Sequence, residues 1–195
     1  MNQDEWVKHI VRQSDFTLRL THLTRRTDNM RAIDVLFQIL DEKCLRASDK
    51  SGFIRKNNRA VCLQEHSLYS LAENILFEDE KATLKYEAFG LRFNKGVLFQ
   101  KGARPAIYGT EEELDQIPEN LQWRCIRMDI SDSNKIVDWS HEREWRYNGD
   151  LMFEYSDIEV ILGCGKSYRE FIERYKESTL LSDINGIIVL DSLLK

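Results

Sequence analysis

Residues 17–40 have the sequence TLRLTHLTRRTDNMRAIDVLFQIL, and this stretch decides the predicted fold. Residues 17–23 alternate between apolar and polar side chains, which is typical of a half-buried β-strand. Apolar side chains then recur at helical spacing over residues 30–40, and Asp28 is the predicted N-cap of this helix. A short strand that leads into an amphipathic helix is therefore the first unit of the predicted fold.

The rest of the chain adds short strands and helices in no regular alternation. Further strands are predicted at residues 60–63, 86–93, 104–108, 123–130, 142–147, 158–162 and 187–190, the last as a central strand. Further helices are predicted at residues 4–13, 111–116 and 167–175, and after a cap at Ser67. This order predicts an α+β fold with a mixed, strongly bent β-sheet and flanking helices. Because no GxGxxG follows a strand, a doubly wound dinucleotide-binding fold is disfavoured.

Length and composition limit the class of protein. With 195 residues, 42% of them hydrophobic, the chain fits a single domain over residues 1–195. A net charge of −5 argues against a general basic surface for nucleic acid. The four cysteines show no CxxC spacing, and neither a signal peptide nor an apolar run of membrane-spanning length is present. We therefore expect a cytoplasmic protein without a membrane partner.

Two motifs resemble known sites but lack a required residue. The sequence GCGKS at residues 163–167 follows a predicted strand, yet Val160 stands where a phosphate-binding loop needs glycine. An ordinary glycine turn before a helix is the favoured interpretation. The sequence HEREW at residues 141–145 lacks the second histidine of a zinc-protease helix. The four histidines are scattered, so no metal site is expected.

The first of three candidate clusters lies at the end of the strand over residues 17–23. The sequence there is LTHLT, which includes His22 and Thr24. A histidine at a strand end can form a hydrogen bond with a ribose hydroxyl or a carboxamide. The alternative is a polar residue that simply ends the strand.

The second cluster is a group of basic residues in an acidic protein. Lys95, Lys101 and Arg104 lie close together in sequence, and Gly96 and Gly102 lie beside them. Glycines allow the backbone to approach a ligand closely, and an arginine can bond two phosphate oxygens at once. The cluster predicts a pyrophosphate-binding loop, with a solvated basic loop as the alternative.

The third cluster is the sequence DWSHEREWR at residues 138–146. On a strand, Glu142 and Glu144 would share one face, as paired carboxylates do in acid–base catalysis. Trp139 and Trp145 are candidates for the walls of such a site. The alternative is a charged edge strand held by salt bridges between its glutamates and arginines.

Together the clusters resemble the site of the ADP-ribosyltransferase superfamily, in which an early histidine or arginine, a middle aromatic residue and a late glutamate follow one another in chain order. Here these residues are His22, then Tyr108 with Arg104, then Glu144. The stretch RPAIY at residues 104–108 is similar to a motif of DNA-targeting ADP-ribosyltransferase toxins. The Glu142-x-Glu144 pair resembles the glutamate pair of other members, in which the second glutamate is catalytic.

The whole chain is also similar to bacterial abortive-infection proteins, which confer phage resistance. The similarity spans residues 18–165 and includes a Thr-His start, the strands at Val61–Glu65 and Phe89–Lys95, and a late Glu-x-Glu-Trp-Arg. It implies a role in antiviral defence, in which toxin–antitoxin pairs are one arrangement.

These resemblances imply a site for NAD as substrate. His22 and Thr24 would hold a ribose or the adenosine side, Lys101 and Arg104 would contact the pyrophosphate, and Tyr108 would stack on nicotinamide.

The resemblances also imply catalytic roles for the two glutamates. Glu144 would stabilise the oxocarbenium ion, and Glu142 would orient or deprotonate an acceptor in nucleic acid or protein.

Two other functions stay open at this point. One is a non-catalytic member of the same fold, such as an antitoxin or a nucleotide-sensing partner of a toxin. The other is an unrelated enzyme, for example a nuclease that uses Glu142, Glu144 and Asp138 around a divalent metal.

Overall fold

The computed structural model describes residues 2–11, 15–48, 54–55, 58–79 and 87–193. The chain divides into two compact units, each built from separate segments. The first unit contains Met1–Cys44, His66–Lys95 and Met152–Lys195, and the second contains Leu45–Glu65 and Gly96–Leu151. We describe each unit by itself, and the expectation of a single domain stays a prediction.

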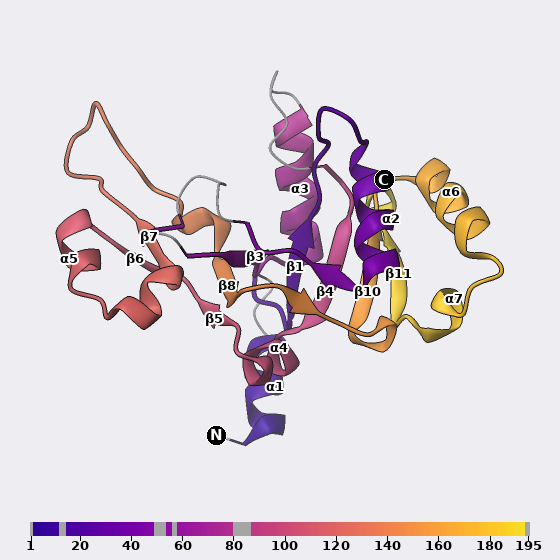
Figure 1. Ribbon diagram of the computed structural model, residues 1–195, viewed down its shortest axis with the longest axis horizontal. Coiled ribbons are helices and arrows are strands. Elements are labelled where there is room, and N and C mark those ends of the chain that lie inside the picture. The colour runs from indigo at the N-terminus through magenta and orange to yellow at the C-terminus, as the bar shows by residue number, and fades with distance from the viewer. Residues whose placement is uncertain (1, 12–14, 49–53, 56–57, 80–86, 194–195) are drawn as a thin grey trace. The chain divides into compact units, whose positions relative to one another are not determined.

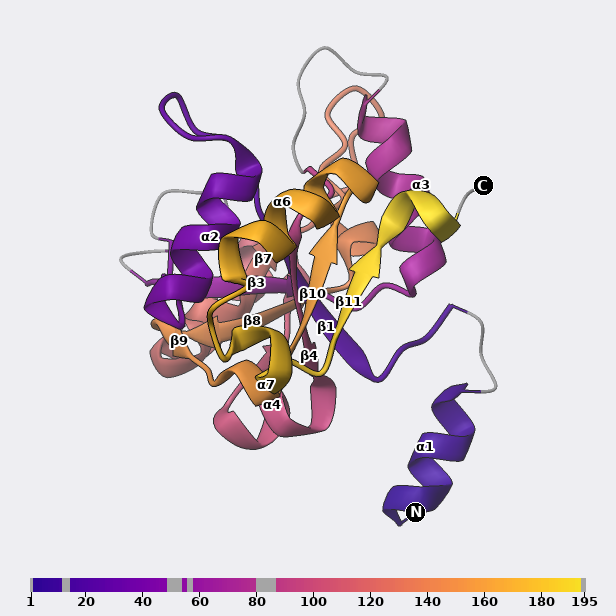
Figure 2. The ribbon, with the colours of Figure 1, turned by 90° about the vertical axis from the view of Figure 1, so that its right-hand side faces the viewer.

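The first unit contains a mixed β-sheet. Its strands are β1 (Arg19–Leu23), β4 (Gly90–Asn94), β10 (Ile158–Leu162) and β11 (Gly186–Val189), in the order β11-β10-β4-β1. β10 and β11 are parallel and lie side by side in Figure 2, whereas β4 is antiparallel to both β10 and β1. The predicted α+β class with a mixed sheet and flanking helices is thus confirmed.

One glycine is essential for the contact between β1 and β4. In the register of the two strands Gly90 lies opposite Leu23. A Cβ atom on Gly90 would lie 2.2 Å from the carbonyl oxygen of His22. Only glycine allows the two backbones to approach this closely.

The first unit also contains several helices. They are α1 (Gln3–Val11), α2 (Ala32–Glu42), α3 (Leu68–Asp79), α6 (Gly165–Tyr175) and α7 (Leu180–Asp183), with 3-10 turns at Tyr155–Asp157 and Leu190–Leu193. The apolar stripe of α2 is buried, and the ring of Phe37 lies 6.5 Å from Phe171 and 5.9 Å from Tyr175 of α6. A second apolar cluster joins Leu71 and Ile75 of α3 to the sheet.

Most predicted elements of the first unit form, with three corrections. Ser67 caps α3 as predicted, because its hydroxyl accepts the N–H of Ser70. The N-cap of α2 is Arg31 and not Asp28, since a turn closed by Thr27 delays the helix start to residue 32. β11 ends the strand order, so the prediction of a central strand is wrong. β4 begins at residue 90, and Tyr86 of the predicted strand lies outside the described residues.

The second unit contains an antiparallel sheet and a parallel strand pair. In the sheet, β8 (Glu144–Asn148) lies between β3 (Ala60–Gln64) and β5 (Arg104–Pro105), as Figure 1 shows. The parallel pair consists of β6 (Ile107–Gly109) and β7 (Cys125–Arg127). The other elements are α4 (Lys95–Lys101), which begins at the boundary between the units, α5 (Glu111–Asp115) and the 3-10 helices η1 (Glu119–Arg124) and η2 (Ser140–Glu142). Two short strands, β2 (Cys44–Leu45) and β9 (Leu151–Met152), stand at the segment boundaries.

Three predictions for the second unit are corrected. The basic loop after residue 94 is the helix α4. The strand predicted at residues 104–108 divides at Ala106 into β5 and β6, which pair with different strands. The strand predicted at 142–147 begins only at Glu144, because Arg143 adopts a left-handed backbone conformation with φ 44°.

Within the described ranges, each helix is too short or too polar to cross a bilayer.

Candidate functional site

The sheet of the second unit gathers polar side chains on one face of β8. Glu144 and Arg146 are two residues apart, so their side chains share this face. Directly opposite on β3 lie Gln64, which pairs with Glu144, and Cys62, which pairs with Arg146. This group of four side chains, with Glu142 and Tyr108 beside it, is called the Glu144 cluster below.

Arg146 fixes the Glu144 carboxylate. Arg146 Nε donates a 2.6 Å hydrogen bond to Glu144 Oε1. The Arg146 side chain is 2% exposed, and its NH1 group donates at 3.0 Å to the carbonyl oxygens of Trp123 and Cys125. A salt bridge was the predicted alternative to a catalytic role, and it is present. β8 is however flanked on both sides, so the prediction of an edge strand is wrong.

Tyr108 contacts the backbone of the same glutamate. The Tyr108 hydroxyl accepts the N–H of Glu144 at 3.2 Å, and the N–H of Ala106 donates to the Glu144 carbonyl at 2.8 Å. Burial raises the pKa of the Tyr108 phenol, so the hydroxyl stays protonated. The structure therefore brings two predicted site residues together, Tyr108 and Glu144.

Glu142 joins the Glu144 cluster by a different route from the predicted one. It lies in η2 and not on the strand, so the two glutamates do not share a strand face. Its buried carboxylate accepts a hydrogen bond from Nε2 of Gln64, the residue opposite Glu144. His141 Nε2 lies 3.9 Å from Glu142 Oε1. Gln64 thus bonds to the Glu142 carboxylate and lies opposite Glu144 in the sheet register.

Sequence reasoning missed two members of the cluster, Gln64 and Cys62, and included Arg146 only in the alternative of salt bridges along the strand. Arg146 carried a signal, because it follows Glu144 by two residues on a predicted strand. Gln64 and Cys62 carried none, since they enter through the register of β3 on β8. Burial, with a smaller contribution from Glu144, raises the pKa of the Cys62 thiol to about 12. Cys62 is therefore a neutral thiol.

The three cations of the basic cluster have different environments in the structure. Lys95 is buried and belongs to the first unit, whereas Lys101 is exposed at the end of α4. Arg104 NH1 donates at 2.7 Å to the carbonyl oxygens of Phe99 and Ala103, and its guanidinium lies 3.9 Å from the centre of the Phe99 ring. Arg104 is the member of the cluster with defined hydrogen-bond geometry, and the shared pyrophosphate site stays a prediction.

Trp145 does not wall the carboxylates as predicted. Trp145 alternates with Glu144 along β8, so its side chain is on the opposite face. There its ring lies 6.5 Å from Phe99, and its indole N–H donates to Glu65 at 2.7 Å. The ring of Trp139 lies 6.0 Å from that of His141.

His22 and Thr24 belong to the first unit and are described apart from the Glu144 cluster. His22 lies on β1 opposite Leu91. The Thr24 hydroxyl is buried and donates to the carbonyl oxygen of Ala32 at 3.0 Å. Thr24 thereby fixes the loop that leads from β1 to α2.

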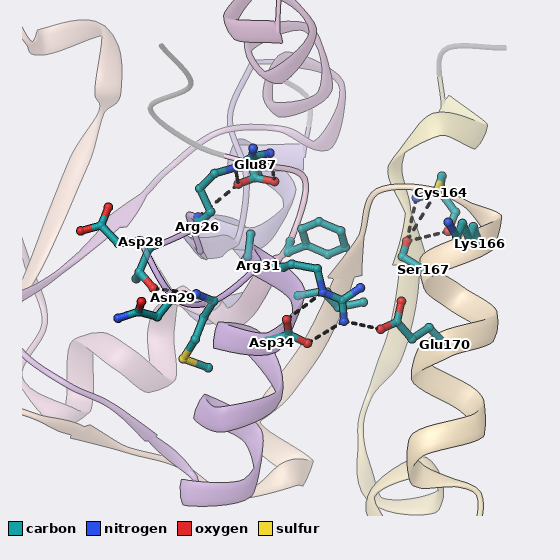
Figure 3. A pocket seen from close by; sticks show the side chains of 15 residues that line it. Arg26, Asp28, Asn29, Arg31, Asp34, Glu87, Cys164, Lys166, Ser167 and Glu170 are labelled. Carbon is teal, nitrogen blue, oxygen red and sulfur yellow. Dashed lines mark hydrogen bonds and ion pairs between the residues drawn. The ribbon is translucent and has the colours of Figure 1, made fainter.

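This loop lines a cavity of about 560 Å³ (Figure 3). Such a volume is typical of small-molecule sites. Arg31 spans it and donates at 2.7 Å both to Asp34 of α2 and to Glu170 of α6. The lining residues are Arg26, Thr27, Asp28, Asn29, Met30, Arg31, Ala32, Ile33, Asp34, Glu87, Phe89, Cys164, Lys166, Ser167 and Glu170.

The rejected phosphate-loop motif also lies at this cavity. Its residues form the turn and helix start that were predicted, with Cys164 as the N-cap of α6. The Ser167 N–H bonds to the Cys164 sulfur and lowers the pKa of this exposed thiol.

The metal-dependent alternative finds no support in the described residues. Nowhere in these ranges do three or more His, Cys, Asp or Glu side chains form a group that could hold a metal ion. Asp138, one of the three proposed ligands, accepts the N–H of Ser140 at 2.8 Å.

Comparisons with known proteins give no match. No family model matches the chain, and no curated protein or solved structure is similar to it at a significant level.

Proposed function

We propose that this protein is an NAD-cleaving ADP-ribosyltransferase-like enzyme that acts in bacterial phage defence. The observation that carries the proposal is the fixed position of the Glu144 carboxylate, which Arg146 holds by a 2.6 Å hydrogen bond while Tyr108 and Ala106 hold its backbone. A preorganised carboxylate costs no reorganisation when positive charge develops beside it. The order of His22, Tyr108 and Glu144 along the chain supports the same activity.

The proposed reaction breaks the bond between nicotinamide and ribose C1′. Nicotinamide leaves with the bonding electrons, and Glu144 stabilises the positive charge that remains on the ribose. The acceptor then forms a bond to C1′, and Glu142 takes its proton. The acceptor is nucleic acid or protein, and water would replace it in simple NAD hydrolysis.

The other predicted contacts complete the proposal. Arg104 and Lys101 contact the pyrophosphate, and the ring of Tyr108 stacks on nicotinamide.

Nicotinamide release from NAD tests the proposal. Glu144→Gln keeps the shape of the side chain and an oxygen for Arg146 but removes the charge. We expect a loss of about 100-fold or more in the rate, by analogy with the removal of one charge-stabilising group in other enzymes. Glu112→Gln, which alters an exposed glutamate on α5 of the same unit, is the matched control and should retain the activity. EDTA should have no effect, and release that persists in Glu144→Gln would refute the role of Glu144.

The cavity of the first unit favours a second candidate function. Its volume suits a small polar ligand, so the chain would be a non-catalytic nucleotide-sensing protein or an antitoxin in a defence pair. Binding of NAD without release of nicotinamide would favour this candidate. Substitution of Arg31 would then weaken binding, whereas Glu144→Gln would leave it unchanged.

A further inference from the structure

Two arginines of the second unit meet at β5. Arg104 belongs to this strand, and Arg124, at the end of η1, donates from Nε to the carbonyl oxygen of Pro105 at 3.1 Å. Arg104 uses NH1 for the carbonyl oxygens of Phe99 and Ala103. Both guanidinium groups therefore lie around one short strand and retain further N–H donors.

These two arginines differ from other arginines of the unit in having no carboxylate. Within the described part of the chain, Arg104 and Arg124 bond only to carbonyl oxygens. Arg55, Arg59, Arg127 and Arg146 each form an ion pair with an aspartate or a glutamate. Burial and the nearby charge of Arg104 lower the pKa of Arg124. Two like charges held together in this way are stabilised when an anion binds.

An aromatic group lies beside the arginine pair. The Arg104 guanidinium stacks on Phe99, whose side chain is 47% exposed, and the ring of Trp145 is in edge contact with Phe99. A planar guanidinium stacks on aromatic rings of proteins and of nucleotide bases alike. The surface thus offers hydrogen-bond donors to a phosphate and a flat group to a ring, and a nucleotide contains both a phosphate and a ring.

We propose that Arg104 and Arg124 form a clamp for the phosphate of a nucleotide. The clamp extends the proposed function, because it adds Arg124 to the pyrophosphate contact assigned to Arg104. Only the identity of NAD as a ligand rests on the proposed function. Phosphate binding itself does not depend on NAD cleavage. The same phosphate chemistry occurs in a free dinucleotide and in a strand of nucleic acid.

Binding of inorganic pyrophosphate, ADP, NAD and a single-stranded deoxythymidine oligonucleotide tests the clamp. Arg124→Gln should weaken pyrophosphate and ADP binding by about tenfold or more, because charge-assisted hydrogen bonds to phosphate are lost. Arg127→Gln is the matched control, since Arg127 is only three residues away and is paired with Asp129. Arg124→Lys, which retains the charge, should recover part of the affinity. The proposal is overturned if Arg124→Gln and Arg127→Gln bind pyrophosphate and ADP with equal affinity, or if the unaltered protein binds neither ligand.

A second measurement needs no variant. Phenylglyoxal modifies accessible arginines, and ADP should protect Arg104 and Arg124 but not Arg127 in peptides mapped by mass spectrometry. Equal modification with and without ADP would overturn the clamp even if the Arg124 variants failed to fold.

The ligands distinguish the source of the phosphate and the two proposals. Tighter binding of the oligonucleotide than of NAD would assign the clamp to a strand of nucleic acid, and the reverse would assign it to the dinucleotide. ADP protection without nicotinamide release would refute the proposed function and leave the clamp in place. The clamp alone would be refuted by three results together. Nicotinamide is released, Arg124→Gln and Arg127→Gln have the same KM for NAD, and ADP does not protect Arg104 and Arg124 from phenylglyoxal.

Discussion

The Glu144 carboxylate accepts a 2.6 Å hydrogen bond from Nε of Arg146, its neighbour on the same face of β8. Arg146 is almost fully buried and also donates to the carbonyl oxygens of Trp123 and Cys125. A guanidinium charge buried this deeply is tolerated when hydrogen-bond acceptors surround it. The pair therefore links the proposed chemistry to the stability of the second unit.

Loss of Arg146 should destabilise the protein strongly. Arg146→Met leaves the Glu144 carboxylate and two carbonyl oxygens without their donor, which costs about 3 kcal/mol or more. Arg174→Gln removes a half-exposed ion pair with Asp41 and should cost about 1 kcal/mol or less. Urea unfolding followed by circular dichroism measures both values. Similar losses in the two variants would contradict the structural role of Arg146.

Gly90→Ala should be far more damaging than Gly186→Ala. The added methyl group at residue 90 would lie 2.2 Å from the His22 carbonyl oxygen, whereas nothing lies within 4 Å of the same position at residue 186. We expect a loss of at least about 2 kcal/mol at residue 90 and well under about 1 kcal/mol at residue 186. Thermal unfolding of the two variants provides the comparison, and a stable Gly90→Ala protein would rule out the close approach of β1 and β4.

Cys164 should react with iodoacetamide at a lower pH than Cys62. The Ser167 N–H lowers the pKa of Cys164, so its thiolate forms below the pH at which an ordinary thiol ionises, near 8.5. Burial raises the pKa of Cys62 to about 12, so this thiol stays protonated in the folded protein. Peptide mapping across a pH series measures both rates. Urea-unfolded protein, in which the two cysteines should react alike, is the control.

Acid should lower the free energy of unfolding, in part because it protonates Glu87. A hydrogen bond from Arg26 lowers the pKa of Glu87 in the folded state. The stabilisation is therefore fully present above the unfolded pKa, near 4.5, and is lost as the pH falls through the lower folded value. The free energy of unfolding should fall less steeply with acid in Glu87→Gln than in the unaltered protein or in Glu112→Gln. Parallel pH profiles for all three would show that the Arg26 bond does not contribute.

Elements with a local signal were predictable from the sequence. The apolar run of β10 was predicted at its observed bounds, and the stripe of α2 was predicted because both patterns repeat within a few residues. α4 was missed, since Gly96 and the preceding alternation disfavour a helix at residues 95–101. Burial of Leu98 contributes to a helix there that local propensity does not favour.

The candidate site was predictable in its charged residues and in Tyr108. Glu142 and Glu144 stand out by spacing, but the position of Gln64 opposite Glu144 depends on the pairing of β3 with β8, about 80 residues apart in the chain. The division of residues 104–108 at Ala106 is likewise a result of strand pairing, because β5 and β6 have different partner strands. Such partners come from distant sequence and leave no local pattern.

The interleaving of the two units has a consequence for folding during synthesis. The second unit is complete once residue 151 has left the ribosome, because it contains Leu45–Glu65 and Gly96–Leu151. The sheet of the first unit cannot be completed until the last segment is synthesised, because that segment contains β10 and β11 and β10 lies between β11 and β4. β1 and β4, which are made early, therefore remain an unfinished sheet while the proposed catalytic face takes shape. The nascent chain would thus form the Glu144 cluster before it completes the sheet of the first unit.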